Sequence, residues 1–500
     1  MSNPRIRRRF AVFAVLLLIV LLCAFGRPAF LWIKAWRQDR PVVEPTPQGI
    51  ADDASRMNPT QVADIWPASS DPEQAEKQLR ELLARAHRDQ LKVSIAGAKH
   101  SMGGHTFYPG GVVIDMLPFR RLELDARRNV LTAGAGARWS DIVPFLDAHG
   151  LSVGIMQSNN DFTVGGSLSV NCHGWQHNRP PIASTVESFR IMTADGKIRR
   201  CSRTEDQELF SLALGGYGLF GIILDAELRI VPNERYRPDS EVIDADRYPQ
   251  RFGEMVNQGA AAGMVYGRLC VAPGKDDFLK HAILTVFRQS PCAPAEVPAL
   301  KESGLTGLKR EVFRAQIGSE RGKLYRWRAE QALAQEMQLR HFSRNQLLNE
   351  GSEVFREQNA GRTDILHEYF VPPDRVPAFL ERMRQILPRH NVDLLNVTVR
   401  NVLEDKDTFL RYADREMFAF VMLFNQERSE AADEAMAAAT REMIDAALEC
   451  GGRYYLPYRP HATVAQFRRA YSRAERFFEQ KRSYDPMLLF QNQFFAKYAQ

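Results

Sequence analysis

The stretch 93-VSIAGAKHSMGGHTFYPGGVVIDM-116 decides the fold of the N-terminal half of this chain. Residues 93–96 and 111–116 each have the character of a strand. The loop between them contains glycines at 97, 103 and 104 and two histidines, His100 and His105. Glycines let backbone N–H groups approach a phosphate or a flat ring closely. The loop is therefore a candidate binding loop for a metal, a phosphate or a covalently attached group.

The neighbouring elements predict an α+β protein with mixed sheets. Asp71 is placed to cap a helix whose apolar residues Ala75, Leu79, Leu82 and Ala86 follow the 3.6-residue period. Further strands are expected at 130–137, 365–372, 394–402 and 417–424, and further helices at 139–149, 374–387 and 429–449. Residues 186–231 are interpreted as a second βαβ-like passage, and residues 151–167 as a long loop.

Bulk properties limit the classes of protein. A chain of 500 residues with 45% hydrophobic residues is too long for one core, so two or three domains are expected. The net charge of +6 comes from scattered Lys and Arg, which does not indicate a nucleic-acid partner. The six cysteines include no CxxC pair, so we interpret them mostly as buried thiols.

The N-terminus predicts membrane association. Phe10–Gly26 is uncharged and almost wholly apolar, and as a helix it would span about 25 Å. Arginines at 5 and 7–9 precede it, and 7-RRRFA-11 loosely fits a twin-arginine export signal. We expect a membrane anchor over residues 1–36, followed by a linker over 37–58. A cleaved signal peptide, ending at Ala24-Phe25-Gly26, is the alternative.

Two simple motif interpretations are rejected. The sequence 133-AGAGARW-139 follows a strand and precedes a helix, as a dinucleotide-binding fingerprint does, but Trp139 occupies the third glycine position. We therefore predict an ordinary strand-to-helix turn there. His100 and His105 have no third ligand nearby, so no metal site is predicted.

Glycine-rich turns recur at four places within about 125 residues. They contain Gly97, Gly103 and Gly104; Gly165 and Gly166; Gly174; and Gly215, Gly216, Gly218 and Gly221. Any one of them could be an ordinary turn. Four together indicate a shared ligand with phosphate groups or a flat ring.

The order of these motifs resembles a known family. KHSMGGHTFYPGGVVIDM, VLTAGAGARWSDIVPFLDAHGLSV, TVGGSLSVNCHG and FGIILDAELRIV are similar to the FAD domain of vanillyl-alcohol-oxidase-type (PCMH-type) flavoproteins. That family includes cytokinin dehydrogenases, alditol and aldonolactone oxidases and decaprenyl-phosphoryl-ribose oxidases. The resemblance implies a two-part FAD-binding domain with mixed sheets over 59–235 and an α+β substrate domain with an antiparallel sheet over 236–455. A C-terminal segment, 456–500, would return to the FAD domain.

The resemblance also implies which residues bind FAD. The matching positions are Gly97, Ala98, Lys99, His100, Ser101, Gly103, Gly104, Thr163, Gly165, Gly166, Ser167, Asn171, His173, Gly174 and Ile222. His100-Ser101 matches the pair whose histidine is often bonded to the flavin 8α-methyl carbon. Lys99 stands where the family usually has glycine, so both covalent and non-covalent FAD remain open.

In the substrate half, the resemblance is carried by 367-HEYFVP-372, 396-NVTVRNV-402 and 459-RPHATV-464. It implies Arg400, Tyr458, Arg459 and His461 as catalytic residues. Arg400 would stabilise a developing alkoxide, and Tyr458 or His461 would act as a base or orient a hydroxyl. Alternatively, Arg400 pairs with Glu368 on the sheet face. Thr398 and Val464 replace the Glu and Lys of alditol oxidases, which argues against a simple alditol or lactone.

These implications give an expected function. We expect an FAD-dependent oxidoreductase that oxidises a CH–OH group of a sugar, polyol or lactone-like substrate by hydride transfer to flavin N5. Oxygen or a membrane electron acceptor would reoxidise the flavin. The alternatives are a lipid-linked pentose oxidase of an epimerase pair and a membrane-tethered flavoprotein without turnover. We expect a bacterial inner-membrane protein with the catalytic domain on the periplasmic side.

Overall fold

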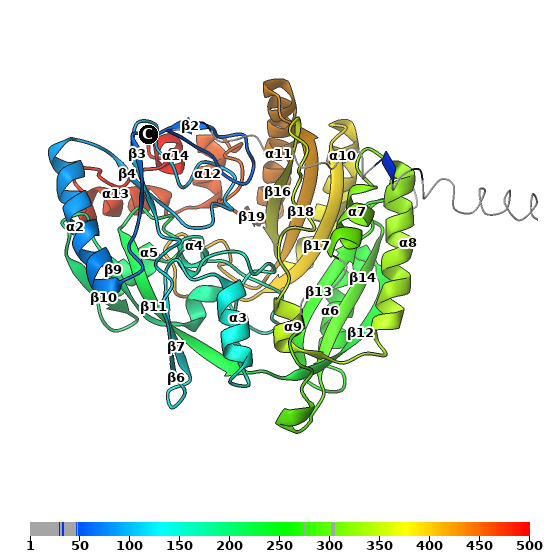
Figure 1. The fold of residues 1–500 in the computed structure, drawn as a ribbon. Coiled ribbons are helices and arrows are strands. Elements are labelled where there is room, and N and C mark those ends of the chain that lie inside the picture. The colour runs from blue at the N-terminus through cyan, green and yellow to red at the C-terminus, as the bar shows by residue number, and fades with distance from the viewer. Residues whose placement is uncertain (1–29, 31–32, 35–46, 48, 275–276, 302–305) are drawn as a thin grey trace, which may run out of the picture.

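The structure is a computed structural model that describes residues 30, 33–34, 47, 49–274, 277–301 and 306–500. The predicted apolar span Phe10–Gly26 lies outside these residues. Among the helices that the structure does describe, none combines the length and the apolar character needed to cross a membrane. Figure 1 shows two lobes: one holds two sheets and the C-terminal helices, and the other holds a single large sheet with its helices.

The first lobe begins with a small parallel sheet in the order β3-β5-β4, built from β3 (Asp64–Pro67), β4 (Val93–Ala96) and β5 (Val112–Asp115). The predicted helix between β3 and β4 is confirmed as α2 (Pro72–Arg88), because Asp71 accepts a hydrogen bond from the Gln74 N–H. Its apolar stripe is buried. A short β1–β2 pair (Ile50–Ala51, Thr60–Gln61) precedes this sheet.

The second sheet of this lobe is antiparallel, in the order β10-β9-β11-β7-β6, with β8 also paired to β11. Its strands are β6 (Leu122–Asp125), β7 (Val130–Gly134), β8 (Leu151–Val153), β9 (Val186–Met192), β10 (Ile198–Ser202) and β11 (Ile222–Pro232). The βαβ-like prediction for 186–231 is wrong, because Gly196 (φ +76°) turns the chain tightly and β9 pairs antiparallel with both β10 and β11. Helices α3 (Trp139–Asp147), α4 (Val164–Ser169) and α5 (Gln207–Ala213) complete this part, so β8 and the start of α4 replace the long loop predicted at 151–167.

The second lobe is an eight-stranded antiparallel sheet in the order β15-β12-β14-β13-β17-β18-β16-β19. Its strands are β12 (Arg235–Asp244), β13 (Ala262–Leu269), β14 (His281–Gln289), β15 (Phe342–Ser343), β16 (Arg362–Val371), β17 (Asp393–Val402), β18 (Met417–Glu427) and β19 (Arg453–Tyr454). Its helices are α6 (Tyr248–Val256), α7 (Thr306–Arg314), α8 (Glu320–Met337), α9 (Arg344–Leu348), α10 (Val376–Arg389) and α11 (Glu430–Glu449).

The two faces of this large sheet have different neighbours. Phe418 contacts α6 through Phe252, and Phe420 contacts α10 through Phe379. On the opposite face, Ile283 packs against Trp327 of α8. Because side chains alternate along a strand, one face is covered by α6, α10 and α11, and the other is shared between α7, α8 and the first lobe.

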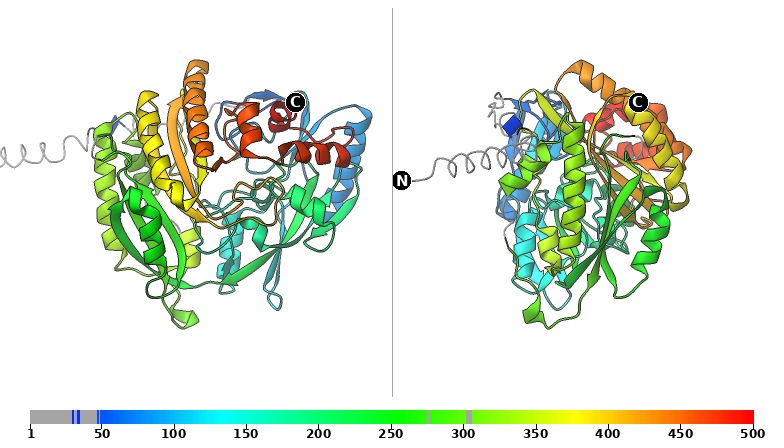
Figure 2. Two further views of the ribbon diagram at one scale, coloured as in Figure 1. Left: turned by 180° about the vertical axis from the view of Figure 1, so that it is seen from behind. Right: turned by 90° about the vertical axis from the view of Figure 1, so that its right-hand side faces the viewer.

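The chain returns to the first lobe after β19. Helices α12 (Val464–Ala470), α13 (Ala474–Tyr484) and α14 (Gln493–Tyr498) lie there, and Figure 2 shows them in red on the side of the small sheet. Phe490 forms a parallel bridge with Val93, so the C-terminal segment abuts β4. Each of the five cysteines that the structure describes is a free thiol, and four of them are buried, as expected.

Candidate active site

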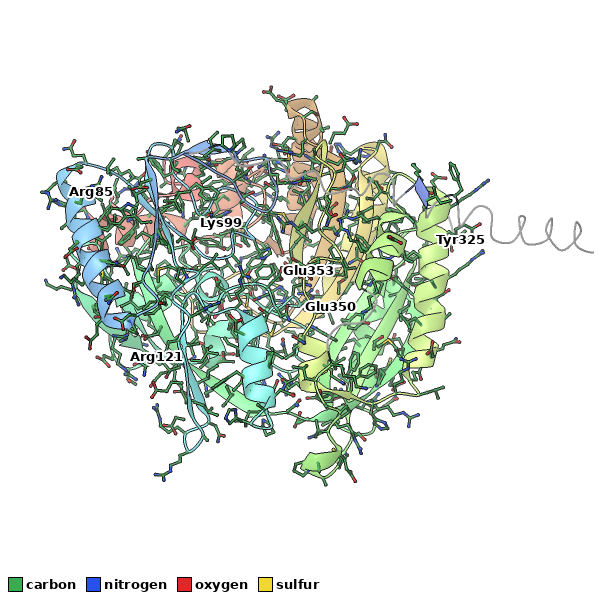
Figure 3. All side chains as sticks on the ribbon, viewed as in Figure 1. Arg85, Lys99, Arg121, Tyr325, Glu350 and Glu353 are labelled. Atoms are coloured by element: carbon green, nitrogen blue, oxygen red, sulfur yellow. The ribbon has the colours of Figure 1, made fainter. Side chains whose placement is uncertain are left out.

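A cavity of about 800 Å³ lies where the two lobes meet. Its wall combines the loop after β4, the segment 157–173 and the exposed face of strands β13, β17, β18 and β16. In Figure 3, Lys99 of the first lobe and Glu350 and Glu353 of the second lie in the middle of the molecule, whereas Arg85, Arg121 and Tyr325 lie toward its edges. The cavity therefore brings together residues that are several hundred positions apart.

The loop after β4 approaches the second glycine loop very closely. A Cβ atom at Gly97 would lie 2.2 Å from the Thr163 Oγ1. Lys99 has a left-handed backbone (φ +57°). Glycine adopts this conformation easily, and glycine is the residue expected at this position from the family resemblance. Gly97, Ala98, Lys99, His100 and Ser101 all line the cavity.

His100 faces an acidic partner in this cavity. Its ring stacks on Phe162, with centroids 4.1 Å apart, and its Nε2 lies 3.4 Å from the Asp161 Oδ2. Ser352 donates a hydrogen bond to the same carboxylate. Burial lowers the pKa of His100, which favours the neutral imidazole. Neutral imidazole has a free nitrogen lone pair, so His100 has the state that a nucleophile needs.

The second glycine loop is fixed from within. Thr163 caps α4 by accepting a hydrogen bond from the Gly166 N–H, and a Cβ at Gly165 would lie 2.8 Å from that of Ala135. The Trp139 indole N–H donates to the Ser167 Oγ at 2.9 Å, so Trp139 supports this loop from the start of α3. Thr163, Gly165, Gly166, Ser167 and His173 line the cavity.

Five of the predicted FAD-binding residues stand behind the wall rather than in it: Gly103, Gly104, Asn171, Gly174 and Ile222. The Gly104 N–H donates to Asp53, and the Asn171 amide donates to Asp405. Ile222 is fully buried in β11, and its neighbour Ile223 lines the cavity instead. These residues therefore shape the loops without presenting side chains to the cavity.

A row of side chains crosses the large sheet beneath the loops. Arg268 is the register partner of Thr398, Thr398 that of Val421, and Val421 that of Glu368. All four line the cavity, as does Arg400, two residues along β17 from Thr398. Antiparallel partners share a face, which explains how four strands contribute to one wall.

Glu368 was predicted only as a possible ion-pair partner of Arg400, but it lies at the centre of the polar groups of the cavity. It is 3% exposed, and its carboxylate accepts hydrogen bonds from the Tyr458 hydroxyl, at 3.1 Å, and from the His173 ring. Burial, and then the charge of Glu368, raise the pKa of Tyr458 well above its ordinary value, so the phenol stays protonated. A lone carboxylate inside the apolar strand sequence 365-ILHEYFV-371 was the available signal.

Arg400 is held beside this carboxylate without pairing to it. Its Nη2 donates to the Ser158 Oγ at 2.7 Å, and its buried Nε has no hydrogen-bond partner among the described residues. No ion pair with Glu368 is recorded within the described chain, so the alternative of a sheet-face ion pair does not hold. Burial lowers the pKa of Arg400, and a guanidinium in such a place gains from a negative charge in the cavity.

Arg459 and His461 do not reach the cavity, contrary to the prediction that they are catalytic. Both contact Asp433 on α11: Arg459 through an ion pair, and His461 through its Nε2 at 3.1 Å. The Arg459 Nη1 also donates to the Asn58 Oδ1 at 2.7 Å. The His461 N–H donates to the Arg459 carbonyl at 2.8 Å, so the chain bends tightly at Pro460. Among the described residues of the segment 458–461, Tyr458 alone lines the cavity.

The wall of the cavity fits FAD. Glycines allow backbone N–H groups to face phosphate oxygens, and several buried polar groups of the wall have no partner within the described structure: the hydroxyls of Ser101 and Thr106, the Trp175 N–H and the Arg400 Nε. Groups of this kind are expected to bind a large polar ligand. A Cys172 thiol in the wall, with its pKa raised to about 12 by burial, stays protonated and packs as an inert group.

Comparison with known proteins agrees with this fit. Residues 73–202 match the family described as FAD binding domain, so the chain contains an FAD binding domain. Mouse L-gulonolactone oxidase is 30% identical over 155 residues, 31% of this chain and 35% of that protein. The L-galactono-1,4-lactone dehydrogenase 2 of rice mitochondria is 31% identical over 180 residues, 36% and 31% of the two chains. Decaprenylphosphoryl-beta-D-ribose oxidase of Mycolicibacterium smegmatis is 30% identical over 170 residues, 33% and 36%. The chain thus spans about a third of the length of these relatives.

Proposed function

From its FAD binding domain, we propose that this protein is an FAD-dependent oxidoreductase that oxidises a CH–OH group of a sugar, polyol or lactone-like compound. One observation carries the proposal: Glu368, Tyr458, His173 and Arg400 line the same cavity as the FAD-type glycine loops. The names of the relatives, which act on lactones and a lipid-linked ribose, support a substrate of this class.

Each polar group of the site has a role in this chemistry. When bound, FAD accepts a hydride from the carbinol carbon. Glu368 accepts the hydroxyl proton, while Tyr458 and His173 keep its carboxylate oriented through their hydrogen bonds. Arg400, with its free Nε, stabilises the alkoxide character that develops on the substrate oxygen. The proton therefore leaves through Glu368, and the oxygen stays beside a positive charge.

Two finer features belong to the same proposal. His100, neutral and beside Asp161, would hold FAD covalently through the 8α-methyl carbon, which would lose one hydrogen while its two electrons pass to the acceptor that reoxidises the flavin. The apolar N-terminal span anchors the protein in a bacterial inner membrane, with the catalytic domain in the periplasm, and either oxygen or a membrane electron acceptor reoxidises the flavin. The name of the ribose oxidase relative favours a lipid-linked pentose as the second candidate substrate.

Anaerobic bleaching of the yellow flavin tests the reaction. We expect at least one polyol, sugar or lactone of a panel to bleach the purified protein. Glu368→Gln should keep the flavin and slow bleaching by about 10²-fold or more, because general-base catalysis is worth about that much. Glu350→Gln is the matched control, since Glu350 is another carboxylate of the cavity wall, with a side chain 46% exposed.

The outcomes separate the alternatives. Bleaching of Glu368→Gln at the wild-type rate would remove Glu368 from the reaction. A flavin that no member of the panel bleaches, a short-chain lipid-linked pentose included, would favour a flavoprotein without turnover. A protein that takes up no FAD at all would contradict the cofactor.

A further inference from the structure

A second cleft, of about 250 Å³, lies away from the cofactor cavity. Its wall includes Phe409, Arg411, Asp414, Arg453 and Arg473. The structure describes all of the lining residues, and none of them also lines the larger cavity. The cleft joins the long loop between β17 and β18, the end strand β19 and the turn between α12 and α13. In Figure 2 this loop runs toward the red C-terminal helices.

Positive charge exceeds negative charge in this cleft. Asp414 is its one carboxylate among the described lining residues, and it is already engaged: one oxygen accepts from the Arg453 Nη2 at 2.7 Å and the other from the Arg415 Nε at 3.2 Å. Within the part of the chain that the structure describes, no ion pair is recorded for Arg411 or Arg473. Two guanidinium groups of the cleft are therefore not neutralised by a contacting carboxylate.

Another carboxylate of the same loop, Asp405, forms no ion pair with Arg411 within the described residues, although its charge acts on Arg411 at longer range. Asp405, on the same loop as Arg411, is 1% exposed and accepts hydrogen bonds from Asn171 and Thr408. Arg411 instead donates its Nε to the Thr408 carbonyl at 3.2 Å. Its remaining guanidinium N–H groups are free to bind a ligand in the cleft.

Arg453, the third arginine of the cleft, has a buried N–H donor without an acceptor among the described residues. The Arg453 Nε donates to the Ala470 carbonyl at 2.7 Å and its Nη2 to Asp414, which fixes the plane of the guanidinium. Its Nη1 is buried and has no hydrogen-bond partner among the described residues. A buried, unsatisfied donor on a fixed guanidinium is costly unless a ligand accepts from it.

Arg473 contributes a positive charge to the cleft and lies at the N-terminus of α13. Its guanidinium lies 3.7 Å above the centre of the Phe409 ring, and it is the N-cap of α13 without capping through its side chain. Burial, and then the charge of Arg411, lower the pKa of Arg473. An anion in the cleft would relieve this repulsion and would meet the positive end of the α13 dipole.

We propose that this cleft binds a small oxyanion of the phosphate class through Arg411, Arg453 and Arg473. Planar guanidinium groups bind phosphate oxygens with paired hydrogen bonds, and a cleft of about 250 Å³ is large enough to admit a phosphoryl group. A free phosphate and the phosphate of a lipid headgroup present the same oxygens. The site is independent of the flavin reaction.

Calorimetric titration of the full chain, purified in detergent and loaded with FAD so that the cofactor's own phosphate sites are filled, tests the proposal. Inorganic phosphate at constant ionic strength should bind with one-to-one stoichiometry. Arg411→Gln and Arg473→Gln should each weaken binding about tenfold or more. Arg476→Gln, on the exposed surface of α13 with a side chain 64% exposed, should leave binding unchanged.

A parallel titration with short-chain phosphatidic acid distinguishes the two sources. If phosphatidic acid binds more tightly than inorganic phosphate and its binding still depends on Arg411, the natural ligand is a lipid headgroup. If phosphatidic acid binds equally well or more weakly, the natural ligand is a free phosphate. Phosphate binding that survives Arg411→Gln and Arg473→Gln unchanged overturns the site, as does the absence of binding by both ligands. Arg453 is not substituted in this test, because it also donates a hydrogen bond to the Ala470 carbonyl and its loss could disturb the fold.

Discussion

At the scale of single residues, the cavity combines loop residues that are close together in the chain with wall residues that are far apart in it. His100, Thr163 and Ser167 lie in motifs whose spacing is visible in the chain, and all three line the cavity. Glu368 was visible only as part of a strand. Its importance comes from Tyr458 and His173, which reach it from 90 and 195 residues away.

His100→Ala tests the covalent bond. We expect acid precipitation of the wild-type protein to leave the yellow colour in the pellet, and the variant to release it to the supernatant with the fold retained. The neutral imidazole is the nucleophile that the bond requires, and alanine lacks it. His149→Ala, at an exposed histidine, is the control. Loss of all flavin and of solubility in His100→Ala would show that His100 is structural instead.

Arg400→Ala tests the charge beside Glu368. We expect kcat/KM to fall more than tenfold on any substrate that bleaches the wild type, because one preorganised donor to a developing oxyanion is worth a few kcal/mol. Arg400→Lys should recover part of the rate, because it keeps the charge. Steady-state kinetics measure both. Unchanged kinetics in Arg400→Ala would exclude Arg400 from the site.

At the scale of elements, the turn after β7 shows why the rejected fingerprint is still rich in glycine. A Cβ atom at Gly136 would lie 1.8 Å from the Met116 carbonyl oxygen, so the β7–α3 turn packs directly against the end of β5. The glycines allow close contact between backbones, and Trp139 follows them to support Ser167. The pattern serves packing within the fold.

Gly136→Ala should therefore lower the free energy of unfolding by about 3 kcal/mol, because the backbone has to shift to admit the methyl group. Gly253→Ala is the matched control: it lies in α6, with nothing within 4 Å of the added Cβ. Alanine there should stabilise the protein by about 0.5–1 kcal/mol, since it favours the helix. Denaturant midpoints measure both. A Gly136→Ala midpoint equal to that of the wild type would contradict the contact.

At the scale of the whole molecule, the two lobes are joined by a polar network that includes Arg459, which the sequence predicted to be catalytic. Asp433 of the large lobe holds Arg459, and Arg459 reaches Asn58, whose amide donates to Asp53. Asp53 in turn accepts from the Gly104 N–H of the first glycine loop. Asp433 of the second lobe therefore helps to position the cofactor loop of the first lobe through Arg459.

Asp433→Asn removes a titrating carboxylate of this tie, so the stability difference between the variant and the wild type should depend on pH. Partial burial would raise the pKa of Asp433, but the hydrogen bonds from His461 and Arg459 lower it below its ordinary value. A carboxyl group whose pKa is lower in the folded state than in the unfolded chain stabilises the fold at pH values above the unfolded pKa of about 4. This stabilisation is lost as the pH falls from about 4 through the lower pKa of the folded state. We expect the variant to lose about 3 kcal/mol at neutral pH, because Arg459 is left buried and unpaired, and the difference to shrink below about pH 4.

Thermal unfolding of both proteins across pH measures this difference. Asp445→Asn, on the same helix with a side chain 42% exposed, should change stability by less than about 0.5 kcal/mol at any pH. A difference that stays constant from neutral to acidic pH would show that the Asp433 charge does not stabilise the fold.

Elements with local signals could be predicted from the amino-acid sequence alone. The capped helix α2, the strands β4 and β5 around their glycine loop, and helices α10 and α11 follow from periodicity and capping within short windows. Windows this short do not contain the contacts between distant segments, which form only when the chain folds. Folding pairs β9 antiparallel with β10 and β11. It also brings Glu368 into contact with Tyr458 and His173. The contacts with Asp433 turn Arg459 and His461 away from the cavity. Pairing and side-chain encounters of this kind depend on packing between distant segments, which the local sequence does not encode.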